Sequence, residues 1–374
     1  MVMASGQPRT GVREAYAAVA RKPGGQFTIE AVHLDAPRPG EVIVKIAGAG
    51  ICHTDLVFRD QFVPFSLPAV LGHEGAGVVV ETGAGVTDVR PGDRVVISYS
   101  SCGECDRCRE RYTSYCRSFA PLNYGGRRLE DGSTALSAAG ERLSSHFFGQ
   151  SCFASHAVAR SRNLIKIDDT SLPLEILGPL ACGIQTGAGS VLNALACQPG
   201  SSIAILGGGS VGLSAVMAAA LAGCAVIAVV EPFGVRRALA LDLGATHVLD
   251  SASGDVAGNL RAISAAGFDF VLDSTGNSTV IEAGLAALGN RGTMGLLGLP
   301  GRRSDGFKAN IASLIASGGR ITGITEGDSD PREFIPKLIS HYKAGRFPFP
   351  KLITTFNFAD INRAVELPVS YTHL

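Results

Sequence analysis

Residues 203–212 read Ile-Ala-Ile-Leu-Gly-Gly-Gly-Ser-Val-Gly, and this stretch decides the fold of the central part of the chain. Four consecutive apolar residues predict a strand buried on both faces. The glycines that follow match the spacing Gly-x-Gly-x-x-Gly, and an apolar stretch of helical character comes next. A strand, a glycine turn and a helix in this order are typical of a dinucleotide-binding fold.

Each glycine of this turn has its own physical reason. Gly207 permits the tight turn, Gly209 lets the backbone approach a pyrophosphate, and Gly212 lets helix and strand pack closely. The helix start, which includes Val211, offers N–H groups and a positive dipole to phosphates. The alternative is a plain helix-start turn that binds no ligand.

Glu231 lies nineteen residues beyond Gly212, at the end of the next predicted strand. There its carboxylate accepts hydrogen bonds from the adenosine ribose hydroxyls and repels a 2′-phosphate, which favours NAD over NADP. Arg236 and Arg237 lie nearby and would soften that preference.

Strand and helix patterns alternate after this turn, which predicts a doubly wound parallel sheet of six strands in a domain over 184–325. The uncharged stretch 211–230 is long enough to span a bilayer. We interpret it instead as a buried helix leading into a buried strand, because glycines interrupt it and Glu231 ends it. The five further strand candidates are 225–230, 247–249, 268–272, 293–297 and 320–324.

The segments before and after this domain have a different sequence pattern. Short β-branched runs broken by Gly and Pro predict a barrel-like β-rich domain over 1–183. The polar, Gly-rich residues 117–150 are interpreted as a long surface loop. Mixed helix and strand patterns resume after 326, so the β-rich domain is expected to return over 326–374, with the nucleotide domain inserted into it.

Length, charge and cysteine content limit the class of protein. A chain of 374 residues exceeds what one core normally serves, so two domains are the default. Net charge zero gives no electrostatic reason to bind nucleic acid. The start of the chain has no visible signal peptide, so the nine cysteines indicate metal and thiol chemistry in the cytoplasm rather than disulfides.

Four cysteines fall within the loop 98–120, spaced Cys-x-x-Cys-x-x-Cys followed by a gap of seven residues and a fourth Cys. Four thiolates complete a closed tetrahedral shell, which predicts a structural zinc site. The alternatives are a disulfide pair or an iron–sulfur cluster. The four residues are Cys102, Cys105, Cys108 and Cys116.

A second metal set is suggested by Cys52, His73 and Cys182, each in a short motif beside a predicted strand or helix. Two cysteines and one histidine form a three-ligand shell that leaves a fourth position open for water or substrate. Sequence distance alone leaves this grouping open, because a lone buried Cys or His usually belongs to a core.

With these motifs the chain resembles the zinc-dependent medium-chain alcohol dehydrogenases over roughly residues 13–366. The resemblance is carried by residues 72–79, which read Gly-His-Glu-Gly-Ala-Gly-Val-Val, by the four-cysteine loop and by the glycine turn. It implies a GroES-like catalytic domain with an inserted Rossmann domain, two zinc ions and NAD. The motif 52–55 and the stretch 123–153 are most similar to aryl- or benzyl-alcohol dehydrogenases.

The resemblance also implies roles at the reacting centre. Zinc held by Cys52, His73 and Cys182 lowers the pKa of the alcohol, and the alkoxide releases hydride to NAD. Asp55 orients His73, and Thr54 accepts the alcohol proton. A helix cap remains the alternative for Asp55, and a simple turn residue for Thr54.

Further implied roles surround this centre. Glu74 sits beside zinc, with a local structural carboxylate as the alternative. Thr186 packs behind the nicotinamide ring, and Leu297 and Leu299 place backbone groups against its carboxamide. His53 stands where the family has a cation against the pyrophosphate.

One departure from the family concerns the proton relay. Val57 replaces the relay histidine of many members, so His53 or a water is expected to complete the relay.

The substrate implied is a primary aromatic or allylic alcohol, oxidised reversibly to the aldehyde. Phe147 and Phe148 would wall an apolar pocket, or fill a core instead, and Ser98 stands where relatives have a bulky ring. One rival is S-hydroxymethylglutathione dehydrogenase, for which Arg127 and Arg128 would bind the carboxylates. Another is a non-catalytic, zinc-stabilised nucleotide-binding protein.

The end of the chain departs from the family. Residues 367–374 read Leu-Pro-Val-Ser-Tyr-Thr-His-Leu and do not match the family's closing strand, so the alternatives are a truncation, in which that strand is missing, and a sequence artefact. The proline ends the preceding helix. The resemblance further implies a homodimer or homotetramer without nucleic-acid or membrane partners.

Overall fold

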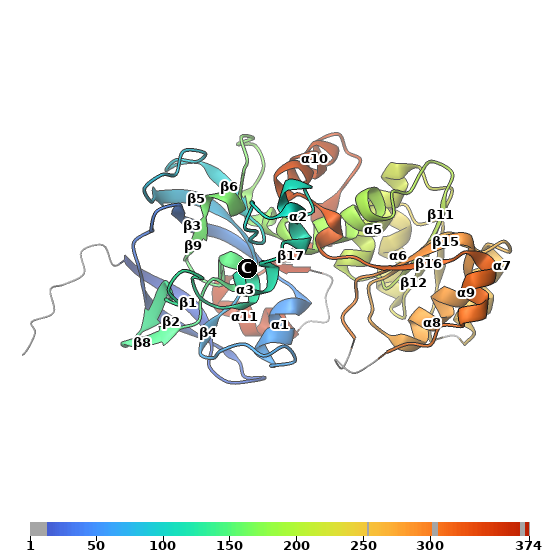
Figure 1. Cartoon of the computed structure of the whole chain (residues 1–374), viewed down its shortest axis with the longest axis horizontal. Coiled ribbons are helices and arrows are strands. Elements are labelled where there is room, and N and C mark those ends of the chain that lie inside the picture. The colour runs from blue at the N-terminus through green and yellow to red at the C-terminus, as the bar shows by residue number, and fades with distance from the viewer. Residues whose placement is uncertain (1–12, 253, 301–305, 367–370, 374) are drawn as a thin grey trace, which may run out of the picture.

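The computed structural model describes residues 13–252, 254–300, 306–366 and 371–373. Figure 1 shows two lobes side by side, a β-rich lobe and a lobe built on one sheet with helices around it. We call the second one the nucleotide lobe. Within the described ranges, every helix is too short or too polar to cross a lipid bilayer.

The nucleotide lobe contains six parallel strands in the order β13-β12-β11-β14-β15-β16, so the predicted doubly wound sheet is confirmed. The strand order reverses between β11 and β14, which creates the crevice where such sheets bind ligands. The strands are β11 (Ser202–Leu206), β12 (Val226–Val230), β13 (His247–Leu249), β14 (Phe268–Asp273), β15 (Leu288–Leu296) and β16 (Arg320–Gly323). The helices are α5 (Ser210–Ala222), α6 (Gly234–Asp242), α7 (Val256–Ile263), α8 (Ser278–Ala286) and α9 (Ile311–Ser317).

The first strand is buried on both faces, as its apolar run predicts. Ile203 and Ile205 point into one hydrophobic cluster, and Ala204 and Leu206 point into another on the opposite face. Because side chains alternate along a strand, this single run anchors both helical layers to the sheet.

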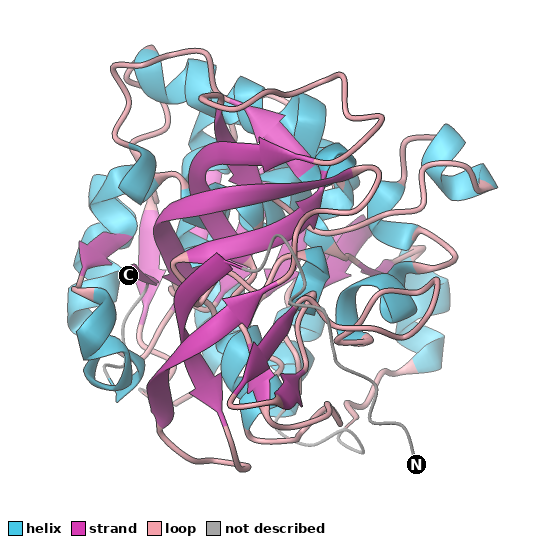
Figure 2. Cartoon of the chain, turned by 90° about the vertical axis from the view of Figure 1, so that its left-hand side faces the viewer, coloured by secondary structure: helices cyan, strands magenta, loops and turns pink. Residues whose placement is uncertain are grey.

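The β-rich lobe contains two further sheets, whose strands are seen face-on in Figure 2. One has the order β4-β1-β2-β7-β8, and the other has the order β10-β6-β5-β3-β18-β17, with β9 paired to β3. The first sheet comprises β1 (Arg13–Ala20), β2 (Phe27–Leu34), β4 (Ala69–Val70), β7 (Leu136–Ala138) and β8 (Glu141–Leu143). The second comprises β3 (Glu41–Ile51), β5 (Glu74–Thr82), β6 (Arg94–Ile97), β9 (His156–Arg160), β10 (Leu164–Lys166), β17 (Ile353–Thr355) and β18 (Tyr371–His373). The helices of this lobe and of the junction are α1 (His53–Arg59), α2 (Asp106–Arg109), α3 (Phe119–Tyr124), α4 (Gly183–Gly189), α10 (Pro331–Lys343) and α11 (Ile361–Glu366).

The prediction of a surface loop over 117–150 is wrong. The segment contains α3, β7, β8 and the 3-10 turn η2 (Phe147–Gly149), and Asn123 and Arg128 within it are buried. The polar composition of the segment suggested exposure to solvent. The Asn123 side chain is polar but buried, because it forms two hydrogen bonds with the backbone of Ser100. Arg128 is buried in an ion pair with Glu41.

The alternative of a truncation in which the closing strand is missing is also wrong. Helix α11 ends at Glu366, and β18 then pairs with β17 in parallel and with β3 antiparallel. Residues 367–370 and 374 of the tail lie outside the described residues. The strand forms through backbone hydrogen bonds, so a sequence that differs from the family's can still form it.

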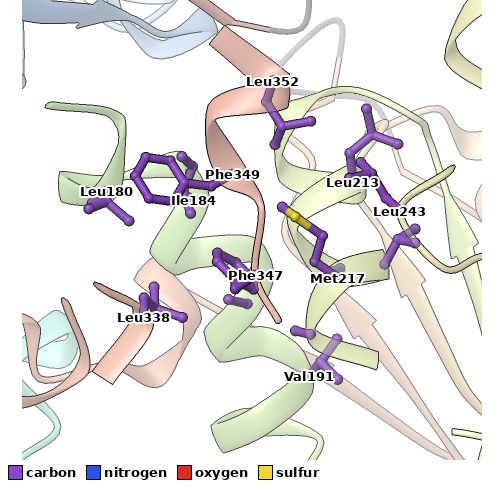
Figure 3. Close-up of a cluster of buried hydrophobic side chains, with 14 of the residues drawn as sticks. Leu180, Ile184, Val191, Leu213, Met217, Leu243, Leu338, Phe347, Phe349 and Leu352 are labelled. Atoms are coloured by element: carbon purple, nitrogen blue, oxygen red, sulfur yellow. The ribbon is translucent and has the colours of Figure 1, made fainter. Parts of the chain in front are cut away.

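The two lobes share a continuous hydrophobic cluster at their junction (Figure 3). Helix α4 contributes Ile184, α5 contributes Leu213 and Met217, and α10 contributes Leu338. Phe347 and Phe349, which follow α10, lie among them and are fully buried. The residues that connect the lobes therefore pack into the same hydrophobic cluster as Ile203 and Ile205 of β11.

Candidate functional site

Three chain segments far apart in the sequence bring their metal-binding side chains together. Cys52 directly precedes α1, His73 directly precedes β5, and Cys182 directly precedes α4. The ligand atoms of these residues and of Glu74 all lie within 4.8 Å of one another. The grouping that sequence spacing left open is therefore present in the fold.

The orientation of His73 fits a metal ligand. Its Nδ1 lies 3.0 Å from Asp55 Oδ1, so Nδ1 carries the proton and Nε2 presents a lone pair. This Nε2 is buried and lacks a hydrogen-bond partner among the described residues. An unsatisfied buried polar atom costs roughly 1–3 kcal/mol, and a metal ion among these side chains would remove that cost.

Asp55 does two things at once. Its Oδ2 accepts a hydrogen bond from the backbone of Cys52 at 3.0 Å, and its Oδ1 accepts one from the backbone of Gly72 at 3.0 Å. The first contact is a helix cap, so capping and contact with His73 occur together rather than as alternatives. The carboxylate thereby fixes the two segments that carry Cys52 and His73.

The electrostatics of the cluster favour a thiolate. A hydrogen bond from Cys182 does most to lower the pKa of the Cys52 thiol well below its usual range, although burial opposes this. Thr54 Oγ1 lies 3.6 Å from Cys52 Sγ and is half-buried, so its hydroxyl borders the cluster. His53 is exposed at the start of the same helix.

Two buried carboxylates complete this site. Glu74 Oε1 accepts a 3.1 Å hydrogen bond from the backbone of Gly183, and burial together with the Cys52 charge raises its pKa. Glu326 lies 3.6 Å from the Cys182 sulfur, and burial raises its pKa to about 7. The sequence interpretation missed Glu326. The available signal was an acidic residue just after the carboxyl end of a parallel strand, where such sheets bind ligands.

Aromatic rings surround the His73 imidazole. Phe148 stacks on it at 4.5 Å and Phe147 meets it edge-on at 5.5 Å. Phe147 has no exposed surface, so the prediction that it lines a channel is corrected: it packs behind His73. The Ser98 hydroxyl is likewise buried and donates to the Ala181 carbonyl at 2.7 Å. Tyr124 contacts Phe148 at 5.4 Å and remains half-buried beside this cluster.

The four cysteines of residues 102–116, which we call the cysteine loop, form a second cluster. The sulfur atoms of Cys102, Cys105, Cys108 and Cys116 lie within 4.8 Å of one another. Backbone N–H groups donate to two of them, from Cys102 to Cys116 Sγ at 3.2 Å and from Cys105 to Cys102 Sγ at 3.4 Å. The Cys102–Cys108 sulfur distance of 3.9 Å is far above the ~2 Å of a disulfide. Four converging sulfurs with such donors fit a closed tetrahedral metal site.

The glycine turn has the geometry that its spacing predicts. Gly207 has φ +101°, a value that favours glycine. A Cβ on Gly212 would lie 1.9 Å from the Gly207 carbonyl oxygen, so only glycine fits at this helix–strand contact. A Cβ on Gly209 would meet no atom within 4 Å, so this backbone faces open space at the start of α5, next to Val211.

The Glu231 carboxylate is held beneath this turn. Its Oε2 accepts a hydrogen bond from the backbone of Gly208 at 2.7 Å, and its Oε1 accepts one from Phe233 at 3.0 Å. Arg236 lies 3.8 Å away and stacks over the Phe233 ring. A buried, oriented carboxylate at this position keeps lone pairs for ribose hydroxyls.

Comparison with known proteins agrees with this geometry. A family model described as the alcohol dehydrogenase GroES-like domain matches residues 38–169, and one described as zinc-binding dehydrogenase matches residues 210–342. A geraniol dehydrogenase from Castellaniella defragrans is 47% identical over 94% of this chain and 94% of its own length. The chain belongs to the zinc-dependent medium-chain alcohol dehydrogenase family.

Two solved structures share the whole architecture. An alcohol dehydrogenase zinc-binding domain protein from Burkholderia ambifaria has a TM-score of 0.94 and 48% identity, covering 97% of this chain and 99% of its own. The benzyl alcohol dehydrogenase from Acinetobacter calcoaceticus has a TM-score of 0.93 and 39% identity, covering 96% and 99%. The GroES-like and Rossmann fold implied by the sequence motifs is therefore confirmed, and so is the enzyme class.

Other predicted site residues lie around the glycine turn and the metal cluster. Thr186 is on α4, one turn beyond Cys182, with its hydroxyl 3.3 Å from Glu326 Oε2. Leu297 and Leu299 follow β15 at the same edge of the sheet, and Leu299 is 49% exposed.

One rival loses its support. Nε and Nη2 of the Arg128 guanidinium donate to the two Glu41 carboxylate oxygens, at 2.6 and 2.8 Å, in a buried pair. The prediction that Arg128 binds the carboxylates of a glutathione adduct is therefore corrected, because this cation is already neutralised. Arg127 beside it is exposed.

Proposed function

We propose that the chain catalyses the reversible, NAD-dependent oxidation of a primary aromatic or allylic alcohol to the aldehyde. The observation that carries the proposal is the convergence of Cys52, His73 and Cys182 at the N-termini of two helices and one strand, with the half-buried Thr54 beside them. Three ligands leave one position for the substrate oxygen.

Zinc in this site would supply a Lewis acid that favours loss of the alcohol proton at neutral pH. Residues of the chain orient the metal ligand and transfer the proton. Asp55 keeps the His73 Nε2 lone pair aimed at the cluster. The Thr54 hydroxyl takes up the alcohol proton and passes it toward solvent through His53 or a water, since Val57 has no titratable group.

For the cofactor, the Gly207, Gly209 and Gly212 turn and the start of α5 would hold the pyrophosphate. Glu231 favours the free 2′-hydroxyl of NAD, because a buried carboxylate repels a 2′-phosphate. Thr186 would pack behind the nicotinamide ring, and the backbone around Leu297 and Leu299 would bind its carboxamide.

The substrate class is supported by the ring cluster on His73 and by two relatives whose names state geraniol and benzyl alcohol. The half-buried Tyr124, which packs on the buried Phe148, offers its ring to an unsaturated carbon chain or a benzene ring. A two-carbon alcohol would leave this surface uncovered and gain little binding energy from it.

The test is NADH formation by the zinc-replete protein with benzyl alcohol, geraniol and ethanol side by side. We expect kcat/KM for benzyl alcohol or geraniol to exceed that for ethanol by at least about tenfold. Cys182→Ser should abolish turnover, with NADH binding retained as evidence of an intact fold. Equal rates with ethanol would contradict the aromatic and allylic assignment, and retained turnover in Cys182→Ser would contradict the metal site.

We further propose a cytoplasmic homodimer or homotetramer with two zinc ions per chain. Size-exclusion chromatography with light scattering tests the assembly. A monomer at micromolar concentration would contradict it.

A further inference from the structure

A short turn after β16 reaches from the nucleotide lobe into the candidate metal site. This turn, η7 (Glu326–Asp328), buries the Glu326 side chain to 8% exposure. Glu326 Oε2 accepts hydrogen bonds from the Thr186 hydroxyl at 3.3 Å and from Gln185 Nε2 at 3.4 Å. The Cys182 sulfur lies 3.6 Å from Oε1. One carboxylate thus touches a candidate metal ligand and the residue at the floor of the candidate nicotinamide site.

The backbone of this turn is strained. Glu326, Gly327 and Asp328 have φ values of +53°, +66° and +50°, three consecutive residues in the left-handed region. Each non-glycine residue held there costs on the order of 1 kcal/mol or more. Such a conformation persists only where the surrounding contacts fix it.

The contacts that fix it come from the cysteine loop and from Tyr99, three residues before the loop begins. The Tyr115 hydroxyl donates to Asp328 Oδ1 at 2.6 Å and accepts from the backbone of Thr325 at 3.2 Å. Tyr99 and Thr113 both donate from their hydroxyls to the Ser329 carbonyl, at 2.5 and 3.3 Å. In Figure 1 the helix of this loop, α2, lies at the junction of the two lobes.

On its other side the turn is pressed against α4. A Cβ on Gly327 would lie 2.6 Å from the Gln185 carbonyl oxygen, so the backbone of the turn packs closely against the helix. Asn193 Nδ2 donates to the Gly327 carbonyl at 3.3 Å. The turn is therefore clamped between α4 and the cysteine loop, with Glu326 pointing inward.

We infer that Tyr115 is a positioning residue for cofactor binding. Through its hydroxyl, the cysteine loop holds the Glu326–Asp328 turn in the left-handed conformation and keeps the Glu326 carboxylate against Thr186. The inference rests on the proposed function, because Thr186 matters here as the floor of the nicotinamide site. It gives the cysteine loop a task beyond its own stability, because the loop sets the geometry of the turn that follows β16, the last strand of the nucleotide-lobe sheet.

The experiment compares Tyr115→Phe with Tyr112→Phe in the zinc-replete protein. Both change a tyrosine of the same loop, but Tyr112 is 48% exposed and its hydroxyl makes no hydrogen bond within the described residues. Because the chain has no Trp, NADH binding is followed by the emission of NADH itself. Tyr115→Phe should raise the Kd for NADH about five- to tenfold, the loss expected for two hydrogen bonds. Tyr112→Phe should leave Kd, zinc content and Tm unchanged.

Glu326→Gln keeps the size of the side chain and removes the carboxylate that Thr186 and Gln185 share. It should raise the Kd for NADH as well, and the double variant with Tyr115→Phe should bind little worse than Glu326→Gln alone, because both changes act through one contact. Zinc content should remain at the wild-type value in Tyr115→Phe, which separates positioning from loss of the metal site.

Wild-type affinity for NADH in Tyr115→Phe would overturn the inference, and so would additive effects in the double variant. If the wild-type protein binds no NADH at all, the proposed cofactor site fails and the inference fails with it. If the wild-type protein binds NADH but oxidises none of the alcohols, the proposed substrate is contradicted. The comparison of Tyr115→Phe with Tyr112→Phe then still tests the inference.

Discussion

Asp55 is the residue on which the candidate metal site depends most, because its buried carboxylate bonds His73 and the backbone of both ligand-bearing segments. Asp55→Asn replaces one acceptor oxygen by a donor that faces an N–H group. We expect zinc affinity to fall about 10- to 100-fold, the usual effect of losing such a partner. Competition with a chromogenic chelator measures this affinity.

The matched control is Asp60→Asn at the end of the same helix, where the side chain is exposed and pairs with Arg59 at 2.6 Å. Its zinc affinity should match that of the wild type. An Asp55→Asn protein that holds zinc as tightly as this control would refute the role assigned to Asp55.

Replacement by alanine should have different effects at two glycines of the nucleotide turn. At Gly209 the backbone has φ −74° and open space, so Gly209→Ala should fold with an unchanged Tm and bind NADH at least about tenfold more weakly. At Gly212 the new methyl meets the Gly207 carbonyl, so Gly212→Ala should lose about 1–3 kcal/mol of stability. Thermal unfolding and NADH titration measure both. Equal loss of Tm in the two variants would contradict the difference between the open space at Gly209 and the close contact at Gly212.

Among the elements, the segment from α3 to η2 depends on a buried ion pair for its position. Burial alone would raise the pKa of Glu41, but the His146 imidazole 3.9 Å away and the hydrogen bonds from Arg128 outweigh it and hold the pKa well below its usual range. His146 directly precedes η2, whose Phe147 and Phe148 pack on His73. The pair therefore supports the rings around the site from a distance.

Because the Glu41 pKa is lower in the folded state than in the unfolded state, its contribution is complete above the unfolded value of about 4.3. The contribution is lost as the pH falls below that value. Glu41→Gln should cost about 3–5 kcal/mol at pH 7, as expected for a buried charge left without its partner. The difference from wild type should shrink at pH 4. Urea unfolding at both pH values measures it.

The control for this prediction is Glu130→Gln, since Glu130 pairs with Arg160 on the surface. That change should cost no more than about 1 kcal/mol at either pH. A difference between wild type and Glu41→Gln that stays constant from pH 7 to pH 4 would contradict the assigned linkage.

For the whole molecule, the two cysteine clusters predict about two zinc ions per chain by elemental analysis. Cys105→Ser should retain about one and lose stability, since closed four-thiolate sites contribute directly to folding. Cys182→Ser should also retain about one, with a smaller change in Tm. One zinc in the wild-type protein would instead favour the non-catalytic nucleotide-binding protein.

Short sequence patterns predicted a large part of this fold. The apolar run 203–206, the glycine spacing after it and Glu231 predicted the parallel sheet, because these features act within one strand–turn–helix unit. The interpretation failed over 117–150, where Arg128 and Asn123 are buried polar residues whose partners lie elsewhere in the chain. It failed again at 371–373, where backbone pairing defines the strand. The division into 1–183, 184–325 and 326–374 stays a prediction, since one hydrophobic cluster crosses the junction.

The sequence by itself determined which chemical groups the molecule has and where short-range structure begins and ends. It determined the four-cysteine loop, the nucleotide turn and the three residue types of an open metal shell, because neighbours in sequence form these motifs or a family resemblance marks them. Only the tertiary structure decided which groups meet. It brought Cys52, His73 and Cys182 together, paired Arg128 with Glu41, and carried Glu326 on a strained turn to Cys182. Contacts between residues far apart in the sequence depend on how the layers of the fold pack, and a short stretch of sequence does not contain that information.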